Sequence, residues 1–279
     1  MTSENTPPIV VTDLLYKIDN QLISLLKSLT PDEWNSQTVA KLWNVKDVSA
    51  HLLDGNIRIV SALRDSYSSE KPEIHSYDDL LTYLNGLNAD WVKAMKRVSP
   101  QMIIFLHEAT GKLFCDYYAS LNPFDKAVYS VAWAGQSESL NWMHMAREYT
   151  EKFLHQQQIR EAVNKPGIMT REYFYPFIDT LMFGLSYTYR DIHAEERTVI
   201  KLSISGDIGG EWFLLRQHGE WLLTKENKSE VSSEVIIDPN DGWKLFSKSI
   251  RPNDIMNNVI IKGNRQLGEI ALSMVSVMA

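Results

Sequence analysis

One helical segment of this sequence carries side chains whose types and spacing suit metal binding. In HMAREYTEKFLHQQQIREAV, His144, Glu148, Glu151 and His155 follow one another at spacings of four, three and four residues. Residues at these spacings project from one face of an α-helix. A carboxylate and an imidazole one turn apart can reach the same ion, because a turn rises only about 5.4 Å. Glu151 and His155 are therefore candidate ligands of a divalent metal.

A third ligand must come from elsewhere, because two side chains do not hold a metal ion firmly. His51 is the best candidate, since it lies mid-helix in VSAHLLDG among apolar residues and so points toward the core side of its helix. Two simpler interpretations stay open. A Glu and a His one turn apart are common on charged helix surfaces, and a histidine on an apolar face is often an ordinary buried residue. We interpret His144 and Glu148 as a solvated or helix-packing pair.

The elements that must position these residues are helices. Apolar spacing and breaking residues predict five of them before residue 165. Asn44 with Asp47, Ser76 with Asp79, and Ser99 before Pro100 are expected helix starts. The predicted helices cover residues 7–29, 43–66, 76–98, 99–121 and about 137–163.

The pattern of apolar and polar residues changes after NKPGIMT, which is the first Pro/Gly break that follows the long helical region. We predict two domains, a helical bundle at 1–165 and a small α+β domain at 166–279. One further helix, REYFYPFIDTLMFGLSYTYRD, leads into the second domain. Alternating apolar and polar residues then predict three strands within residues 198–226, and SSEVIIDP and NVIIKG predict two more, in an antiparallel sheet. Short helices are expected at DPNDGWKLFSKSI and at NRQLGEIALSMVSVMA.

Composition narrows the class of protein. Hydrophobic residues make up 44% and charged residues 23% of the 279 residues, which is typical of a globular protein. A formal net charge of -7 argues against nucleic-acid binding, and we expect no membrane span and no signal peptide.

Cys115 is the single cysteine, so an intramolecular disulfide is excluded and the cytoplasm is the expected compartment. Because Cys115 sits in an apolar helix, we interpret it as a buried, inert thiol rather than a nucleophile.

Two stretches carry a resemblance to a known family. LTPDEWNSQTVAKLWNVKDVSAHLLDGNIR resembles the N-terminal region of the mycothiol-dependent maleylpyruvate isomerase family, whose members belong to the DinB-like four-helix-bundle superfamily. The C-terminal part resembles that family's second domain, which is similar to sterol carrier proteins. The family pattern falls on Trp43, Asp47, His51, Asp54, Arg58, Glu151, His155, Ile159 and Arg160.

The resemblance implies a divalent metal, zinc or nickel, held by His51, Glu151 and His155. It also implies a low-molecular-weight thiol and a small-molecule substrate. Three protein ligands leave positions open, which is typical of a catalytic site. Asp54 and Gln158 are expected beside the ligands, and Gln158 stands where the family has an aspartate. Arg58, Arg160, Arg251 and Arg265 are candidates for contacting a substrate anion.

Three functions remain open at this point. The first is a metal- and thiol-dependent enzyme, either a cis–trans isomerase of the maleylpyruvate type or a thiol S-transferase. The second is a non-enzymatic protein that holds a small apolar ligand and keeps a structural or vestigial metal site. The third is a metal-dependent hydrolase that uses metal-bound water. The sequence does not distinguish a monomer from a dimer.

Overall fold

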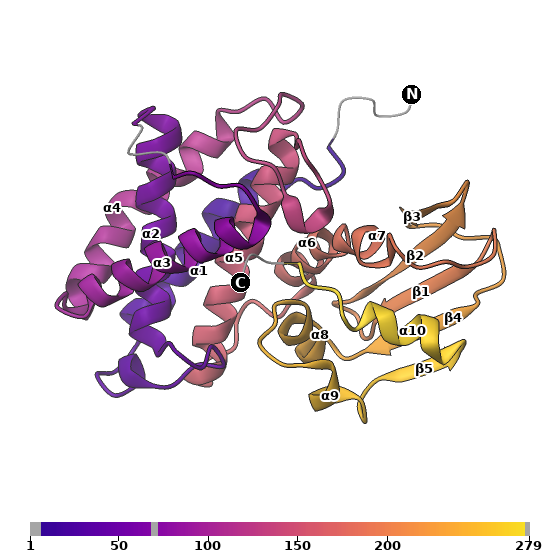
Figure 1. Ribbon diagram of the computed structural model, residues 1–279. Helices are drawn as coiled ribbons and strands as arrows, with labels where there is room; N and C mark the ends of the chain where they lie inside the picture. Colours follow the sequence, from indigo (N-terminus) through magenta and orange to yellow (C-terminus); the bar gives the residue numbers. More distant parts are fainter. Residues whose placement is uncertain (1–6, 68–71, 277–279) are drawn as a thin grey trace. The chain divides into compact units, whose positions relative to one another are not determined.

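The computed structural model describes residues 7–67 and 72–276, and its chain divides into two compact units (Figure 1). The helical unit comprises residues 10–125 and 151–168. The second unit comprises residues 7–9, 126–150 and 169–276. Helical region and C-terminal sheet together form the expected two-domain α+β fold. Residues 126–150 group with the sheet, and the boundary between residues 165 and 166 stays a prediction.

The helical unit is built from four helices and the second part of a fifth. Capping starts three of them where the sequence predicts. Asn44 and Asp47 form a reciprocal capping box, Ser76 accepts from the amide of Asp79, and Ser99 accepts from the amide of Met102. The helices are α1 (Thr12–Lys27), α2 (Val45–Ile59), α3 (Tyr77–Met95), α4 (Pro100–Ala119) and α5 (Asn141–Ala162), with short turns η1 (Glu33–Asn35) and η2 (Val60–Arg64) beside α2.

Apolar side chains from these helices form one core in the helical unit. Helix α2 packs against α3 and α4, and α1 packs against α4. Amphipathic helices bury their apolar stripes in this way, and burial of each large apolar side chain contributes about 1.5–3 kcal/mol. The core includes Leu22, Leu25, Leu26, Val48, Leu52, Leu53, Ile103 and Ile159.

The second unit holds a five-stranded sheet in the order β3-β2-β1-β4-β5. All five predicted strands are present. They are β1 (Val199–Ile204), β2 (Gly210–Gln217), β3 (Glu220–Thr224), β4 (Ser233–Ile237) and β5 (Ile260–Gly263). Helices α7 (Gly184–Tyr189) and α10 (Arg265–Ala271) pack against it (Figure 1).

The prediction of an antiparallel sheet is wrong for one strand pair. Three pairings are antiparallel, but β1 and β4 run parallel, so the sheet is mixed. A parallel neighbour requires the chain to return to the starting edge of the sheet. Residues 225–232 make this return, and an extended segment of that length spans roughly 26 Å, more than the length of a five-residue strand.

Three helical details also differ from the sequence predictions. The helix expected over REYFYPFIDTLMFGLSYTYRD is two helices, α6 (Arg171–Leu181) and α7, because the chain turns at residues 182–183 and brings Gly184 against the Ser276 hydroxyl. Helix α8 (Pro239–Phe246), capped by Asp238, is present as predicted, but α9 (Pro252–Ile255) is an additional short helix that the sequence did not predict. The last helix, α10, ends at Ala271, and residues 277–279 of the predicted helix lie outside the described residues.

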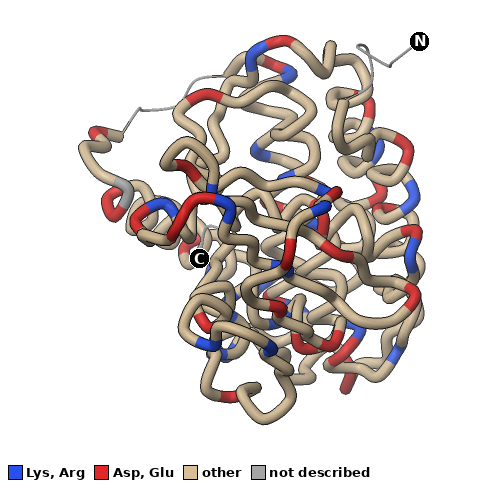
Figure 2. Tube along the Cα trace, turned by 90° about the vertical axis from the view of Figure 1, so that its right-hand side faces the viewer, with Lys and Arg blue, Asp and Glu red and all other residues tan. Residues whose placement is uncertain are grey.

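Charged residues of both signs are interspersed along the chain. Figure 2 shows lysines and arginines scattered among aspartates and glutamates, without a concentration of positive charge on one element. No helix within residues 7–67 and 72–276 is both long enough and apolar enough to cross a membrane.

Candidate metal centre

The three predicted ligands come together in the helical unit. Helix α2 presents His51, and the second part of α5 presents Glu151 and His155. Their ligand atoms all lie within 4.8 Å of one another. Nε2 of His155 is 3.4 Å from Oε2 of Glu151, and the His51 and His155 rings meet edge to face with centroids 4.6 Å apart. Two imidazoles and one carboxylate form a donor set that zinc and related divalent ions accept, so the residues fit a metal ion.

Gln158 determines which nitrogen of His155 faces the other ligands. Nδ1 of His155 lies 2.9 Å from Oε1 of Gln158. An amide oxygen only accepts hydrogen bonds, so Nδ1 carries the hydrogen and Nε2 keeps its lone pair for a metal. Gln158 is 4% exposed, and its burial holds this arrangement in place. The other two glutamines of the HQQQ segment, Gln156 and Gln157, are buried as well but lie on other faces of α5.

A tryptophan covers the two histidines. The ring of Trp43, which precedes α2, lies 4.9 Å from the His51 ring and 6.3 Å from the His155 ring, centroid to centroid. Sequence reasoning included Trp43 in the family pattern but assigned it no role at the site. An aromatic wall beside a metal site limits access of water and raises the strength of electrostatic interactions there.

Helix α2 continues the face of His51 with two charged residues at positions three and seven further on. Burial raises the pKa of the Asp54 carboxyl, and Arg58 opposes that shift. Nε of Arg58 is 3.8 Å from Oδ2 of Asp54, and the arginine side chain is still partly exposed. Arg58 can therefore turn toward an anion without breaking a short ion pair.

The other predicted anion contacts make different interactions. Arg160 is buried and donates to the side-chain oxygen of Gln21 at 3.0 Å and to the carbonyl of Lys165 at 3.1 Å, at the end of α5. Arg251 precedes α9 and its amide donates to Asp254. Arg265 is exposed and lies 2.7 Å from Glu269 in the second unit. Of these candidates, Arg58 is the one that shares a helix face with a predicted ligand.

His144 and Glu148 belong to a separate group in the first part of α5. Nε2 of His144 is 3.5 Å from Oε1 of Glu148 and 2.8 Å from the Arg147 guanidinium, which also pairs with Glu148. Both residues are buried, so the predicted pair is a helix-packing pair and is not solvated.

Cys115 is a buried thiol. It is 1% exposed, and burial raises its pKa to about 12. A thiol in that state is protonated at neutral pH and does not act as a nucleophile.

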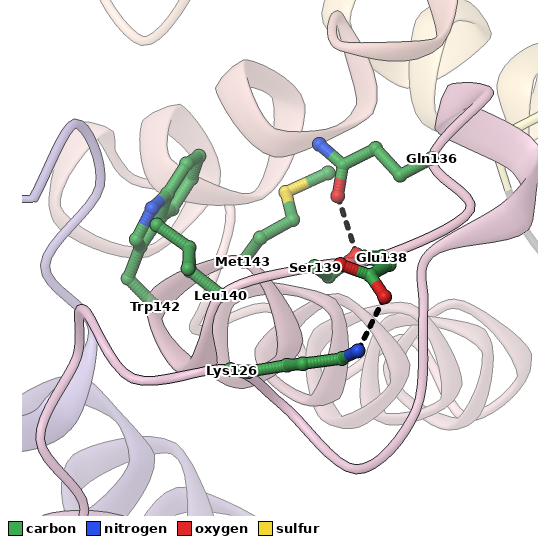
Figure 3. A pocket seen from close by; sticks show the side chains of 7 residues that line it. All are labelled: Lys126, Gln136, Glu138, Ser139, Leu140, Trp142 and Met143. Carbon is green, nitrogen blue, oxygen red and sulfur yellow. Dashed lines mark hydrogen bonds and ion pairs between the residues drawn. The ribbon is translucent and has the colours of Figure 1, made fainter.

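A pocket of about 310 Å³ lies in the second unit (Figure 3). Figure 3 shows the ammonium of Lys126 paired with Glu138 and the hydroxyl of Ser139 paired with Gln136. None of the predicted metal ligands lines this pocket. Its lining residues are Lys126, Gln136, Glu138, Ser139, Leu140, Trp142 and Met143.

Comparison with known families places the helical region of the chain in one family. The family model described as the mycothiol maleylpyruvate isomerase N-terminal domain matches residues 15–160, which include all three candidate ligands. The chain belongs to this family. No curated protein sequence matches the chain.

Two solved structures share the fold of this family member. One is a crystal structure of the mycothiol-dependent maleylpyruvate isomerase, with a TM-score of 0.53, and the other is a histidine-to-alanine mutant of that enzyme, with a TM-score of 0.52. Each is 9% identical to this chain and covers 86% of this chain and 88% of the solved chain. At this identity the likeness establishes the two-domain α+β fold.

Proposed function

We propose that this protein is a divalent-metal-dependent enzyme that uses a low-molecular-weight thiol to isomerise a small cis-alkene acid of the maleylpyruvate type. The observation that carries the proposal is the convergence of His51, Glu151 and His155 within 4.8 Å. Family membership and the fold shared with the mycothiol-dependent maleylpyruvate isomerase support it. Thiols stay reduced in the cytoplasm, where we expect the enzyme to work.

A divalent cation on these ligands, zinc or nickel in our proposal, would lower the pKa of a bound thiol and so supply thiolate at neutral pH. Gln158 orients His155 for this role, and Trp43 limits water at the two histidines. Arg58, on the same face of α2 as His51, would attract the carboxylate of the substrate.

Isomerisation then proceeds by addition and elimination. The thiolate sulfur forms a bond to one alkene carbon, and the π electrons move to the conjugated carbonyl. The former double bond rotates as a single bond. The carbon–sulfur bond breaks as the double bond re-forms in the trans geometry, and the thiol is returned unchanged. An S-transferase would follow the same first step, but the adduct would leave as product.

The first experiment tests the ligands. Protein purified without a metal-affinity tag is loaded with zinc or nickel, and its metal content is measured for the wild type and for His51→Ala, Glu151→Gln and His155→Ala. We expect one metal per chain in the wild type and a loss in each variant. His75→Ala is the matched control, because this histidine side chain is 80% exposed and pairs only loosely with Glu73. Unchanged metal content in His155→Ala would contradict the assignment.

The second experiment tests the reaction. Maleylpyruvate is mixed with the loaded protein and mycothiol, and both trans product and free thiol are counted. An isomerase forms product with no net loss of thiol, whereas an S-transferase consumes one thiol for each product. Trans product formed without any thiol would exclude the thiol-dependent mechanism, and cleavage of maleylpyruvate without thiol would favour a hydrolase that uses metal-bound water.

A further inference from the structure

A buried polar cluster lies beside the candidate metal centre, on a neighbouring face of α5. Lys152 directly follows Glu151 in sequence and is only 5% exposed. Its Nζ donates to Oδ1 of Asp19 at 2.9 Å and to Oδ1 of Asn56 at 2.8 Å. The same Nζ stands 4.3 Å from the centroid of the Phe114 ring. One lysine of α5 thus contacts α1, α2 and α4.

The partners of Lys152 are themselves tightly placed. Nδ2 of Asn56 donates to the Thr110 hydroxyl at 3.3 Å, which ties α2 to α4. The Asp19 carboxylate lies directly against Gly111 of α4, where an added Cβ would come within 2.1 Å of Oδ2. The cluster is therefore both closely packed and hydrogen-bonded across α1, α2, α4 and α5.

Stability alone is a weak explanation for such a cluster. Taking a lysine and an aspartate out of water costs much of what their attraction returns, and well-packed apolar side chains of similar volume are often as stable or more stable. What a buried polar cluster adds is selectivity among packings, because a hydrogen bond tolerates only a few tenths of an ångström while apolar surfaces can slide.

The sequence positions of the cluster relate it to the metal ligands. Lys152 is one residue after Glu151 and three before His155, and Asn56 is five residues after His51. The Lys152–Asn56 hydrogen bond therefore joins the two ligand-bearing helices and fixes the position of α5 along the axis of α2. Metal ligands must meet one ion at about 2.0–2.2 Å, so a small shift between these helices would separate them.

Two further hydrogen bonds hold α2 just before His51. Nε2 of His107 lies 3.0 Å from the carbonyl of Ser49, and Nε1 of Trp91 donates to the carbonyl of Ala50 at 2.8 Å. These bonds join α2 to α4 and α3. Neither bond reaches α5, so both hold α2 against its other neighbours, whereas the Lys152–Asn56 hydrogen bond holds α2 against the helix that carries the other two ligands.

We propose that Lys152, with Asp19 and Asn56, is a positioning group that holds α2 and α5 at the height at which His51, Glu151 and His155 converge on one ion. This inference rests on the proposed metal site. It assigns the cluster no contact with metal or substrate.

The test replaces the whole cluster with apolar side chains of similar size, in the variant Asp19→Leu/Asn56→Leu/Lys152→Met. Cobalt(II) is titrated into metal-free protein, and both the dissociation constant and the visible absorption spectrum are recorded. The thermal midpoint of the metal-free protein is measured in parallel. We expect a midpoint equal to or above that of the wild type, an affinity at least about tenfold weaker, and a changed spectrum. A merely structural cluster would change the midpoint without changing the spectrum.

Tyr16→Phe is the matched control. It removes the 2.8 Å hydrogen bond from Tyr16 to Asp116, which joins α1 to α4 and involves neither ligand-bearing helix. Its cobalt affinity should equal that of the wild type. If the triple variant is unfolded by circular dichroism, Asp19→Asn/Lys152→Met takes its place, with the same expectation for cobalt.

The outcomes separate the two proposals. If the folded cluster variant binds cobalt with wild-type affinity and spectrum, the positioning inference is overturned and the metal site stands. If the wild type binds no cobalt, or if His155→Ala binds it equally well, the metal site itself fails.

Discussion

Nδ1 of His155 donates a hydrogen bond to Oε1 of Gln158 over 2.9 Å, one turn further along α5. The sequence resembles a family in which an aspartate occupies this place. Glutamine supplies an acceptor that fixes the histidine tautomer, but it brings no negative charge to the candidate metal centre. The departure at Gln158 therefore keeps a hydrogen-bond acceptor for His155 and removes a charge.

Replacing this acceptor should weaken metal binding. In Gln158→Leu the imidazole loses the partner that fixes its ring and tautomer, and we expect zinc or cobalt affinity to fall by about 10- to 100-fold. Gln158→Glu restores both acceptor and charge, and should bind the metal at least as tightly as the wild type. Competition titration with a chromophoric chelator measures both. Gln157→Leu is the control, because this buried neighbour points away from the ligand face. Equal weakening in Gln157→Leu and Gln158→Leu would show that the hydrogen bond is not the cause.

The thiol of Cys115 should be unreactive in the folded protein. Burial raises its pKa to about 12, so the thiolate that alkylating reagents require is scarce at pH 8. We expect no labelling by iodoacetamide over an hour in buffer and one label per chain in 6 M guanidinium, followed by mass spectrometry. Rapid labelling of the native protein would mean that the helical unit opens around α4 far more often than its packing indicates.

His107 should make the stability of the metal-free protein depend on pH. Burial lowers its pKa from 6.5 to about 4, and its Nε2 faces the carbonyl of Ser49. Between pH 6.5 and 4, His107 is protonated in the unfolded chain but stays neutral in the folded chain. The free energy of unfolding therefore falls as the pH drops from 6.5 toward 4, by about 1.4 kcal/mol per pH unit or ~3 kcal/mol in all, and then levels off for this group.

Urea unfolding at several pH values checks this slope. In His107→Gln the amide can still donate to Ser49, but the titrating group is gone, so the slope between pH 6.5 and 4 should flatten. His75→Ala, which removes an exposed histidine, should keep the wild-type slope. Identical slopes in His107→Gln and the wild type would assign the acid sensitivity to other groups.

Local signals in the sequence predicted much of the helical unit. Asn44, Ser76 and Ser99 cap the helices they precede, because capping depends on residues only three positions apart. The ligand pair on α5 follows from helical spacing in the same way. The parallel pairing of β1 with β4 does not, since it depends on where a strand docks after a return connection rather than on its own alternation.

Lys152 shows why sequence reasoning did not find the buried polar cluster beside the candidate ligands. A lysine that directly follows a glutamate in a charged helix reads as solvated, and burial of lysine is rare unless it is paired. Its partners, Asp19 and Asn56, lie 133 and 96 residues away in the chain. Only the packing of α1, α2 and α5 reveals that these three polar residues meet in the core.

The close approach of Asp19 to Gly111 gives a final prediction, because alanine normally favours a helix over glycine by about 1 kcal/mol. At Gly111 the new Cβ would lie 2.1 Å from the Asp19 carboxylate, which Lys152 holds in place, so Gly111→Ala should destabilise the protein by about 1–3 kcal/mol. Gly86→Ala is the matched control within α3, since a Cβ there meets no atom within 4 Å, and it should stabilise by about 0.4–1 kcal/mol. If Asp19 is fixed as described, urea unfolding will show a lower free energy of unfolding for Gly111→Ala and a higher one for Gly86→Ala than for the wild type. Stabilisation by both substitutions would mean that Asp19 moves aside easily, and that the polar cluster is too loose to position α5.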